Sequence, residues 1–416
     1  MRVFKFGGAS VKDAEGVINM VKVLTEIGHK DTLVVVSAMG KSTNAFEGVV
    51  DAYFKAPNSC KAALQDLEIF HQDIVEKLFK DAHGPVAKRV KNLCAQCETF
   101  LVNNRSPHRA FVYDQVVSFG ELLSTSIICA YLNHVGIAAE WIDARSCIKT
   151  DNFYRSAHLN WEQTQSAIQD QIQGNVLKVT QGFIGSDENN FTTTLGREGS
   201  DYSAAIFAYC MGATDVTIWK DVDGVLNADP RVFDKTQLLE HMSYQEAIEL
   251  AFYGASVIHP KTLQPLQKKE IPLYVKSFLN PKQNGTKVGK GVRMQPEVPC
   301  YIVKRSLSLL RLSTRDFSFV VEDNISDIFK LLHEHKMSVD VIQNSAISFS
   351  VCVQDKYNNM DALLLSLRSR FDVKHTPDVS LYTIRHFEEN SAASLLKSKE
   401  PILEQRTATT LQLVLK

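Results

Sequence analysis

Two short glycine-bearing turns hold the residues whose types and spacing point most directly to chemistry. In the first turn, Lys5 stands two positions before Gly7 and Gly8. Two glycines let the backbone approach phosphate oxygens, and the lysine charge neutralises them, so this pattern suits a triphosphate. The second turn, residues 195–199, reads Leu-Gly-Arg-Glu-Gly and precedes a predicted helix whose positive end can hold an anion. Taken alone, the first pattern favours an ordinary strand-to-helix turn with a surface lysine.

The first turn is predicted to lie between a strand at 3–6 and a helix that ends at Gly28. Ser10 is a suitable N-cap for that helix. Residues 32–38 read Thr-Leu-Val-Val-Val-Ser-Ala and predict a buried strand that ends in a polar loop.

The second turn is predicted to open a helix. Either Ser200 or Asp201 is a good N-cap, and the apolar residues that follow have helical spacing as far as Gly212, which would end the helix. Residues 215–219, Asp-Val-Thr-Ile-Trp, are β-branched and apolar and predict the next strand.

Further apolar segments at 138–144 and 176–184 predict additional strands, with helices between them. This alternation is typical of a largely parallel sheet covered on both faces, so the expected fold class is α/β, a three-layer αβα sandwich. Ligands of such sheets bind beyond the carboxyl ends of the strands. The loops expected to gather there are those at Gly7, Ser37, Gly196 and Asp221.

Composition is typical of a globular protein with small-molecule partners. The 416 residues exceed one ordinary core and predict two or three domains. Lys plus Arg (46) nearly balance Asp plus Glu (47), which gives no electrostatic case for nucleic acid or an anionic membrane. No apolar run approaches the roughly 20 residues of a membrane span, so we expect a cytoplasmic protein. The only CxxC, at Cys94 and Cys97, lacks a second ligand pair for zinc, so we expect reduced structural thiols and no metal site.

Four blocks of sequence, taken in order, resemble the signature blocks of the aspartate kinases, which belong to the wider amino-acid kinase family. The blocks are KFGGAS at 5–10, TTLGREGSDYSAA at 193–205, WKDVDGVLNADPRV at 219–232 and YGASVIHP at 253–260. Ala9 stands in place of the family's usual Thr. Four blocks in family order are far more specific than any single glycine pattern.

The resemblance implies that the chain phosphorylates the side-chain carboxylate of L-aspartate with ATP, making 4-phospho-L-aspartate. This is the first step of lysine, threonine and methionine biosynthesis, and Mg²⁺ would arrive with the nucleotide. The catalytic residues implied are Lys5, Arg197 and Asp201. The substrate-binding residues implied are Ser37, Thr43, Glu121 and Arg197. The nucleotide-binding residues implied are Lys5, Gly7, Gly8, Lys220, Asp221 and Arg231.

The chemistry of aspartate explains why such residues are needed. A fork-shaped cation, Arg197, suits the α-carboxylate, and an acid, Glu121, suits the ammonium. The side-chain carboxylate is already ionised at neutral pH, so no general base is required. Local alternatives exist: Glu121 could be a first-turn helix charge, Asp201 a helix cap, and His259 a structural residue before a helix that starts at Pro260.

Two positions depart from the family pattern. Ser256 stands where members often carry a nucleotide-contacting Lys, and Glu198 stands where many have Gly. Glu198 adds negative charge beside a doubly anionic substrate, so we expect its side chain to point outward.

The composition changes in the Gly/Pro/Lys-rich segment 281–300. We therefore expect a catalytic domain at 1–280, a linker at 281–300 and a smaller α+β regulatory region at 301–416 that resembles ACT modules, with the second module shortened. The elements expected in this region are a strand at 308–312, a helix at 325–337, strands at 338–343 and 346–353, a helix at 360–371, a strand at 380–387, a short helix at 388–396 and a strand at 407–415.

The regulatory region lacks features that an amino-acid effector would use. Glu322 and Asp323 lie where regulated members usually have a Gly-Phe-Leu turn that receives the effector carboxylate, and Ala346 replaces a Glu. We expect little inhibition by lysine or threonine, and a homodimer or higher oligomer formed through this region. Two other functions stay open: a kinase of this fold for another carboxylate or carbamate, and an inactive amino-acid-sensing partner subunit. Intact Lys5, Arg197 and Asp201 argue against the inactive subunit.

Overall fold

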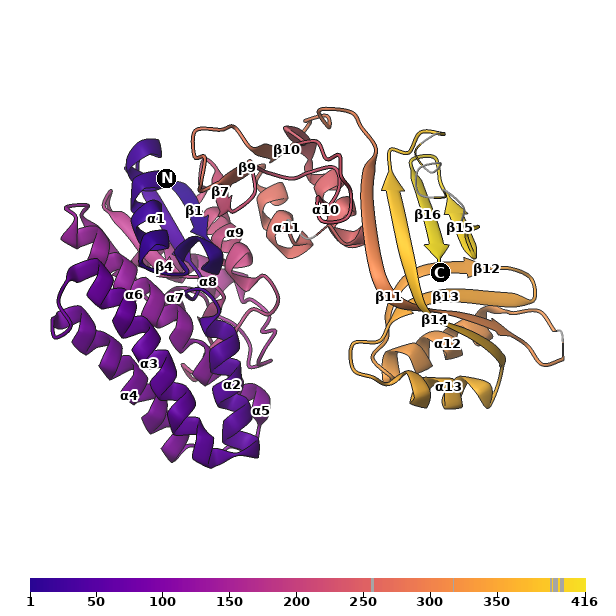
Figure 1. Ribbon diagram of the computed structural model, residues 1–416, viewed down its shortest axis with the longest axis horizontal. Helices are drawn as coiled ribbons and strands as arrows, with labels where there is room; N and C mark the ends of the chain where they lie inside the picture. Colours follow the sequence, from indigo (N-terminus) through magenta and orange to yellow (C-terminus); the bar gives the residue numbers. More distant parts are fainter. Residues whose placement is uncertain (256–257, 317, 390, 392–395, 397–399) are drawn as a thin grey trace. The chain divides into compact units, whose positions relative to one another are not determined.

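The structure, a computed structural model, describes residues 1–255, 258–316, 318–389, 391, 396 and 400–416. The chain divides into two compact units (Figure 1). The first comprises Met1–Val225, Leu238–Ile248 and Val257–Pro296, and the second comprises Leu226–Gln237, Glu249–Ser256 and Glu297–Lys416. The division into domains at 1–280, 281–300 and 301–416 stays a prediction.

An eight-stranded sheet runs through the first unit in the order β3-β4-β2-β1-β7-β9-β10-β8. Every neighbouring pair is parallel except β9 with β10. The strands are β1 Arg2–Phe6, β2 Thr32–Val36, β3 Ala139–Ile142, β4 Leu177–Gln181, β7 Val216–Lys220, β8 His241–Ser243, β9 Leu273–Ser277 and β10 Thr286–Gly289. β10 lies within the segment predicted as a linker. A separate two-stranded sheet pairs β5 Ile184–Ser186 with β6 Thr192–Thr194.

Helices accompany this sheet on both faces. They are the 3-10 turn η1 Gly8–Val11, α1 Ala14–Ile27, α2 Ser42–Lys55, α3 Pro57–Phe79, α4 Pro85–Asn103, α5 Arg109–Val117, α6 Phe119–His134, α7 Ala144–Cys147, α8 Trp161–Gln171, α9 Gly199–Met211, α10 Tyr244–Tyr253 and α11 Pro260–Lys268. Residues of α10 are shared between the two units.

Alternation along β1 separates the two helical layers. Phe4 and Phe6 are buried in a core shared with α1, α3, α4 and α6. Because successive side chains of a strand point to opposite faces, Val3 and Lys5 face the other layer, where α9 packs against β1, β2 and β7 and α8 and α11 pack against α9. The predicted three-layer αβα arrangement is therefore present.

The cap predicted for the first helix is wrong. Oδ1 of Asp13 accepts a hydrogen bond from the N–H of Gly16 at 2.8 Å, so Asp13 and not Ser10 caps α1. Ser10 lies in η1, and its hydroxyl donates to the carbonyl oxygen of Trp219 at 3.3 Å. Ser10 is the first residue in this segment of a type that caps helices, but the 3-10 turn η1 delays the start of α1 until after Asp13. Gly28 ends the helix as predicted, with φ 88°.

One helical stretch, Arg109–His134, is long and apolar enough by length and composition to cross a membrane. This differs from the expectation that no run approaches a span. Most of its apolar window is buried inside the protein, and α6 packs against β2, β3 and β4. Core helices of soluble proteins pass the same test, so the stretch is weak evidence for a membrane.

The second unit contains a six-stranded antiparallel sheet in the order β12-β13-β11-β14-β16-β15. Its elements are β11 Cys300–Ser313, α12 Glu322–Glu334, β12 Ser338–Asn344, β13 Ser348–Gln354, α13 Met360–Arg368, β14 Asp372–Arg385, β15 Leu403–Arg406 and β16 Thr410–Leu415. The predicted β–α–β–β–α order is confirmed. The short helix predicted at 388–396 lies largely outside the described residues.

Two strands of this unit are much longer than the sequence pattern predicts. β11 and β14 are 14 residues each, against predicted strands at 308–312 and 380–387. Register shifts in their pairing lie between Lys304 and Leu309, where Ser306 has φ 57°, and Asp378 on β14 has φ 53°. These irregular positions interrupt the apolar alternation, so the pattern reveals only one half of each strand.

Candidate active site

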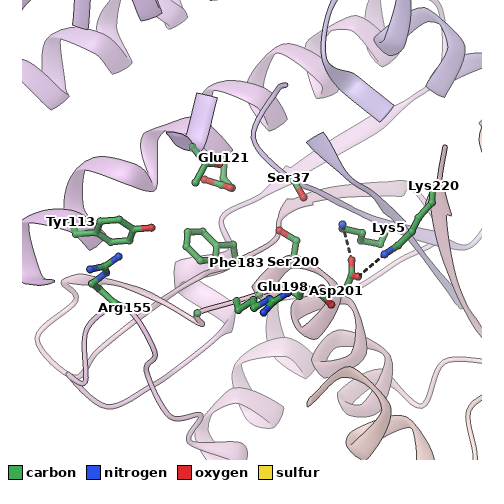
Figure 2. A pocket seen from close by; sticks show the side chains of 14 residues that line it. Lys5, Ser37, Tyr113, Glu121, Arg155, Phe183, Glu198, Ser200, Asp201 and Lys220 are labelled. Atoms are coloured by element: carbon green, nitrogen blue, oxygen red, sulfur yellow. Dashed lines mark ion pairs between the residues drawn. The ribbon is translucent and has the colours of Figure 1, made fainter. Parts of the chain in front are cut away.

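A pocket of about 470 Å³ lies at the carboxyl ends of strands in the first sheet (Figure 2). Lys5 is on β1, Ser37 follows β2, Phe183 follows β4 and Lys220 ends β7. The full lining is Lys5, Ser37, Thr43, Tyr113, Glu121, Arg155, Phe183, Gly196, Arg197, Glu198, Gly199, Ser200, Asp201 and Lys220. Seven residues predicted from the sequence thus come together: Lys5, Ser37, Thr43, Glu121, Arg197, Asp201 and Lys220.

One end of the pocket carries a buried carboxylate between two lysines. Nζ of Lys5 lies 2.6 Å from Oδ1 of Asp201, and Nζ of Lys220 lies 3.8 Å from Oδ2. Burial alone would raise the pKa of Asp201, but the charges of Lys5 and Lys220 outweigh it and hold the pKa below its ordinary value. This end therefore holds an ionised carboxylate and a net positive charge, which suits a phosphate group.

The predicted capping role of Ser200 or Asp201 is wrong. α9 begins at Gly199, its N-cap is Glu198, and Asp201 lies inside the first turn with its side chain directed at Lys5 and Lys220. The lysine partners are supplied by β1 and β7, which local sequence does not reveal. Gly212 ends the helix in the left-handed region, as predicted.

Glu121 is a buried acid with one oxygen uncommitted. Its Oε1 accepts a hydrogen bond from the N–H of Ala38 at 3.2 Å. Its Oε2 is buried and has no hydrogen-bond partner among the residues that the structure describes. Burial raises the pKa of Glu121 to about 8, although the Ala38 hydrogen bond acts to lower it. A buried carboxyl oxygen that lines a pocket without a partner is suited to receive a cationic ligand group.

The fit between α6 and the loop after β2 positions Glu121. A Cβ on Gly120 would lie 3.0 Å from Cβ of Ala38, so the helix and the loop touch closely at this point. The hydroxyl of Ser124 donates to the carbonyl oxygen of Ser37 at 2.8 Å. Both contacts fix the loop that carries Ser37 against the start of α6.

Glu198 does not point away from the pocket as expected. It lines the pocket, and its Oε2 is buried with no hydrogen-bond partner within the described part of the chain. Its φ of 53° is in the left-handed region, where Gly is the least strained residue.

The first glycine turn lies next to the loop after β2 but outside the pocket lining. A Cβ on Gly8 would come within 2.8 Å of the carbonyl oxygen of Ala38 and 2.9 Å of that of Gly40. The N–H of Gly40 also donates to the carbonyl oxygen of Gly8 at 3.1 Å. Only glycine permits this approach.

The remaining nucleotide residues predicted from sequence are more dispersed. Gly7, Gly8 and Asp221 are not among the pocket-lining residues. Arg231 belongs to the second unit, where its guanidinium donates to Asp229 and pairs with it at 2.7 Å. Ser256, the predicted departure from a nucleotide-contacting Lys, lies outside the described residues.

His259 caps a helix, in agreement with its structural interpretation. Its Nδ1 accepts a hydrogen bond from the N–H of Lys261 at 3.2 Å, and α11 begins at Pro260. Burial lowers its pKa.

Sequence reasoning missed three side chains of the pocket, which are Tyr113, Arg155 and Phe183. Cζ of Arg155 lies 4.2 Å from the centre of the Tyr113 ring. The Tyr113 hydroxyl donates to Oε1 of Glu47 at 2.8 Å. None of these residues is in a signature block, and the loop of mixed polar and apolar residues that carries Arg155 gives no local signal of a site.

Comparisons with known proteins give the family and the fold of the chain. The model of the amino acid kinase family matches residues 1–277. Lysine-sensitive aspartokinase 3 of Escherichia coli is 30% identical over 354 residues, which cover 84% of this chain and 77% of that protein. Chloroplastic aspartokinase 1 of Arabidopsis thaliana is 32% identical over 368 residues, or 84% of this chain, but the match spans only 62% of the plant protein. The solved structure of E. coli aspartokinase III with aspartate and ADP matches at 25% identity with a TM-score of 0.82, over 100% of this chain and 96% of that one. This match confirms the predicted fold class.

Proposed function

The chain belongs to the amino acid kinase family and, within it, to the aspartokinases, and we propose that it transfers the γ-phosphoryl group of ATP to the side-chain carboxylate of L-aspartate. The observation that carries this proposal is the pairing of two unlike groups in one pocket. Glu121 offers an ammonium a buried oxygen that has no hydrogen-bond partner in the described part of the chain, and Lys5 and Lys220 offer positive charge to a phosphoryl group. The E. coli relative was solved with aspartate and ADP, which supports the same pair of substrates.

In this proposal each charged residue has a separate task. Glu121 binds the α-ammonium, and Arg197 forms a bidentate contact with the α-carboxylate. The side-chain carboxylate, ionised at neutral pH, attacks the γ-phosphorus in line without a general base, and ADP leaves as the bond from the γ-phosphorus to the bridging oxygen breaks. Lys5 and Lys220 stabilise the negative charge on the transferring phosphoryl oxygens, and Asp201 fixes both lysines in place.

Magnesium enters the reaction as part of the substrate MgATP. Within the described ranges no three His, Cys, Asp or Glu side chains gather as metal ligands. Asp201, a carboxylate at the phosphate end, is already paired with two lysines. The nucleotide's own phosphates would therefore supply the ligands that hold the ion. Gly7, Gly8, Asp221 and Arg231 keep their proposed roles in nucleotide binding.

Assembly and location form a second part of the proposal. We infer a cytoplasmic homo-oligomer, joined through the C-terminal region 301–416, with a catalytic domain at 1–280. Support comes from the antiparallel sheet of that region, whose outer strands β12 and β15 each pair on one side only within the described chain. The buried position of the apolar stretch Arg109–His134 supports a location away from the membrane.

A hydroxamate assay tests the activity directly. Purified protein is incubated with MgATP and L-aspartate, and hydroxylamine traps the acyl phosphate as a coloured hydroxamate. Matched reactions contain L-glutamate, N-acetyl-L-glutamate or carbamate with the same nucleotide. Product with L-aspartate alone supports the proposal. Product with another acceptor favours a different kinase of this fold, and nucleotide-independent binding of amino acids without product favours a sensing subunit.

A further inference from the structure

We propose that Asp114 is a positioning residue that holds the turn bearing Arg197 in place relative to Glu121, and so sets the geometry of the amino-acid end of the pocket. The inference rests on the proposed aspartate kinase activity, in which Glu121 binds the α-ammonium and Arg197 binds the α-carboxylate. Asp114 lies on α5, outside the four signature blocks and outside the pocket lining. It therefore acts on the substrate only through the residues that it contacts.

The carboxylate of Asp114 is fully buried and meets three hydrogen-bond donors. Both of its oxygens accept from the N–H of Arg155 at 3.0 Å. Its Oδ2 accepts from the N–H of Thr194 and its Oδ1 accepts from the Thr194 hydroxyl, each at 2.8 Å. Burial raises the pKa of Asp114 to about 7, although these hydrogen bonds act to lower it. Because an ionised carboxylate offers only acceptors, it satisfies all three donors at once.

Asp114 and its neighbour Gln115 occupy one edge of β6, where a further strand would otherwise pair. Within the described chain, β6 pairs with β5 along its other edge only. The Gln115 amide donates to the carbonyl oxygen of Thr192 at 2.7 Å and accepts from the N–H of Thr192 at 3.1 Å. Asp114 then accepts from the N–H of Thr194. Buried backbone groups need partners, so these two side chains fix where β6 lies against α5.

The end of β6 leads directly into the turn that carries Arg197. The carbonyl oxygen of Thr194 accepts from the N–H of Ala157 at 2.9 Å. A Cβ on Gly196 would lie 3.2 Å from the carbonyl oxygen of Arg155, so the turn also lies close to the residue whose N–H Asp114 accepts. Arg155 has a left-handed φ of 70°, which persists only where the surroundings over-determine it. Asp114 thus fixes both segments that enclose the start of the turn.

The second part of the link is Glu121, which follows Asp114 on the helical stretch Arg109–His134. α5 and α6 meet at the buried Ser118, whose hydroxyl donates to the carbonyl oxygen of Gln115 at 3.0 Å. Asp114 therefore connects the acid proposed for the ammonium to the turn proposed for the α-carboxylate. Both substrate groups are attached to the same carbon atom, so a small shift between Glu121 and Arg197 would weaken both contacts.

The alternative is that Asp114 only stabilises the fold, and Gln115 is a matched control for that alternative. Gln115 is also buried on α5 and forms two hydrogen bonds to β6, but it contacts Thr192, farther from the turn. Gln115→Met keeps the length of the side chain and removes both bonds. Asp114→Asn keeps the shape of the side chain but places an NH₂ donor among donors, so at least one of them loses its partner.

The test compares Asp114→Asn, Gln115→Met, Thr194→Val and Thr194→Ser with the wild type at about pH 8.5, above the pKa values of about 7 for Asp114 and about 8 for Glu121. In Asp114→Asn the KM for L-aspartate should rise about tenfold or more and the KM for ATP should stay within about twofold, since a misplacement of about 1 Å can cost about 100-fold. Thr194→Val removes the hydroxyl contact and should raise the KM for L-aspartate less, whereas Thr194→Ser should match the wild type. Gln115→Met should lower the melting temperature but keep the KM for L-aspartate within about threefold.

The inference is overturned if Asp114→Asn keeps the wild-type KM for L-aspartate, or if Asp114→Asn and Gln115→Met raise it equally. If Asp114→Asn does not fold, the two Thr194 variants decide. A KM for L-aspartate that is higher in Thr194→Val than in Thr194→Ser supports the inference, and equal values overturn it.

Calorimetric titration of L-aspartate without nucleotide separates this result from failure of the proposed activity. If the wild type binds aspartate but makes no product, the kinase proposal fails. The inference then stands if Asp114→Asn weakens that binding about tenfold while Gln115→Met does not, and it falls if the two variants bind alike. If the wild type binds no aspartate, both proposals fail.

Discussion

Nζ of Lys5 lies 2.6 Å from Oδ1 of Asp201, in an ion pair whose side chains are only 10% and 4% exposed. The two residues come from the first strand and from the first turn of α9, so the ion pair joins the two glycine-bearing turns of the sequence. A buried pair of this kind fixes a charge in place at the cost of desolvating both partners. The lysine is therefore held ready at the phosphate end of the pocket before a nucleotide arrives.

The first prediction concerns Lys5→Met. Turnover should fall at least about 100-fold, because the charge that stabilises the transferring phosphoryl oxygens is lost. Asp201 would also be left buried with Lys220 at 3.8 Å as its remaining cation, which should lower the free energy of unfolding by roughly 1–3 kcal/mol. Steady-state kinetics and denaturant unfolding measure the two effects. The double variant Lys5→Met with Asp201→Asn is the control, since it should recover stability without activity.

The second prediction concerns Arg197→Ala. The side chain is exposed at the rim of the pocket, so its removal should leave the melting temperature within about a degree or two of the wild type. The KM for L-aspartate should rise by about tenfold or more, while the KM for ATP stays the same. A near-wild-type kcat/KM for aspartate would refute the assignment of Arg197 to the α-carboxylate.

The third prediction uses the pKa of Glu121, which burial raises to about 8 in the free protein. The ionised carboxylate binds an ammonium and the protonated form does not, so the substrate must displace a proton below this pH. The KM for L-aspartate should therefore fall as pH rises, by up to about tenfold per unit below pH 8, and level off above it. Glu121→Gln should show a higher KM that does not change across the same range.

The raised pKa of Glu121 also predicts that the stability of the fold depends on pH. Stability should fall as pH rises, whereas the affinity for L-aspartate should increase. The pKa of Glu121 is higher in the folded protein than its ordinary value of 4.5, so the folded state favours the proton. Its contribution to stability is present below the unfolded pKa and is lost progressively as pH rises toward 8, at up to about 1.36 kcal/mol per unit. Glu121→Gln should therefore melt at a higher temperature than the wild type at pH 8.5, and the difference should shrink toward pH 5. Equal differences at both pH values would contradict the assignment.

The parts of the site that follow strand ends could be predicted from the sequence. Lys5, Ser37 and Lys220 lie on or just after apolar runs, and parallel strands bring their carboxyl ends to one edge of the sheet. Glu121 and Arg197 required the family resemblance as well, because a charge in the first turn of a helix or in a glycine turn has an ordinary structural explanation. Local pattern and resemblance together therefore identify most of the pocket.

The parts that sequence could not reveal depend on contacts between distant residues. Asp201 looks like a helix cap, because its partner Lys5 lies on another strand. Arg155 looks like any loop arginine, because the buried carboxylate that shapes its backbone, Asp114, lies 41 residues earlier. Glu198 was expected to point outward, since nothing local indicates that its side chain lines the pocket. In each case a tertiary partner decides what the side chain does.

The fifth prediction concerns regulation and assembly by the second unit. Glu322 and Asp323 lie in the first turn of α12, and both are exposed there. Their charges already compensate the positive end of the helix, so an effector carboxylate would meet repulsion instead of a free helix terminus. The carbonyl oxygen of Ala346 is also occupied, since it accepts from the N–H of Val320 at 2.9 Å.

An effector changes activity only when it binds two states of the protein with different affinity. We therefore expect lysine and threonine, each at about 10 mM, to change activity by less than about twofold. This concentration lies above the micromolar to millimolar dissociation constants that are usual for specific binding. The variant Glu322→Gly with Asp323→Phe removes both acids and is the matched comparison. Light scattering on the same samples should give twice the chain mass or a higher multiple. Strong inhibition of the wild type by either amino acid would overturn the first expectation, and a monomer would overturn the second.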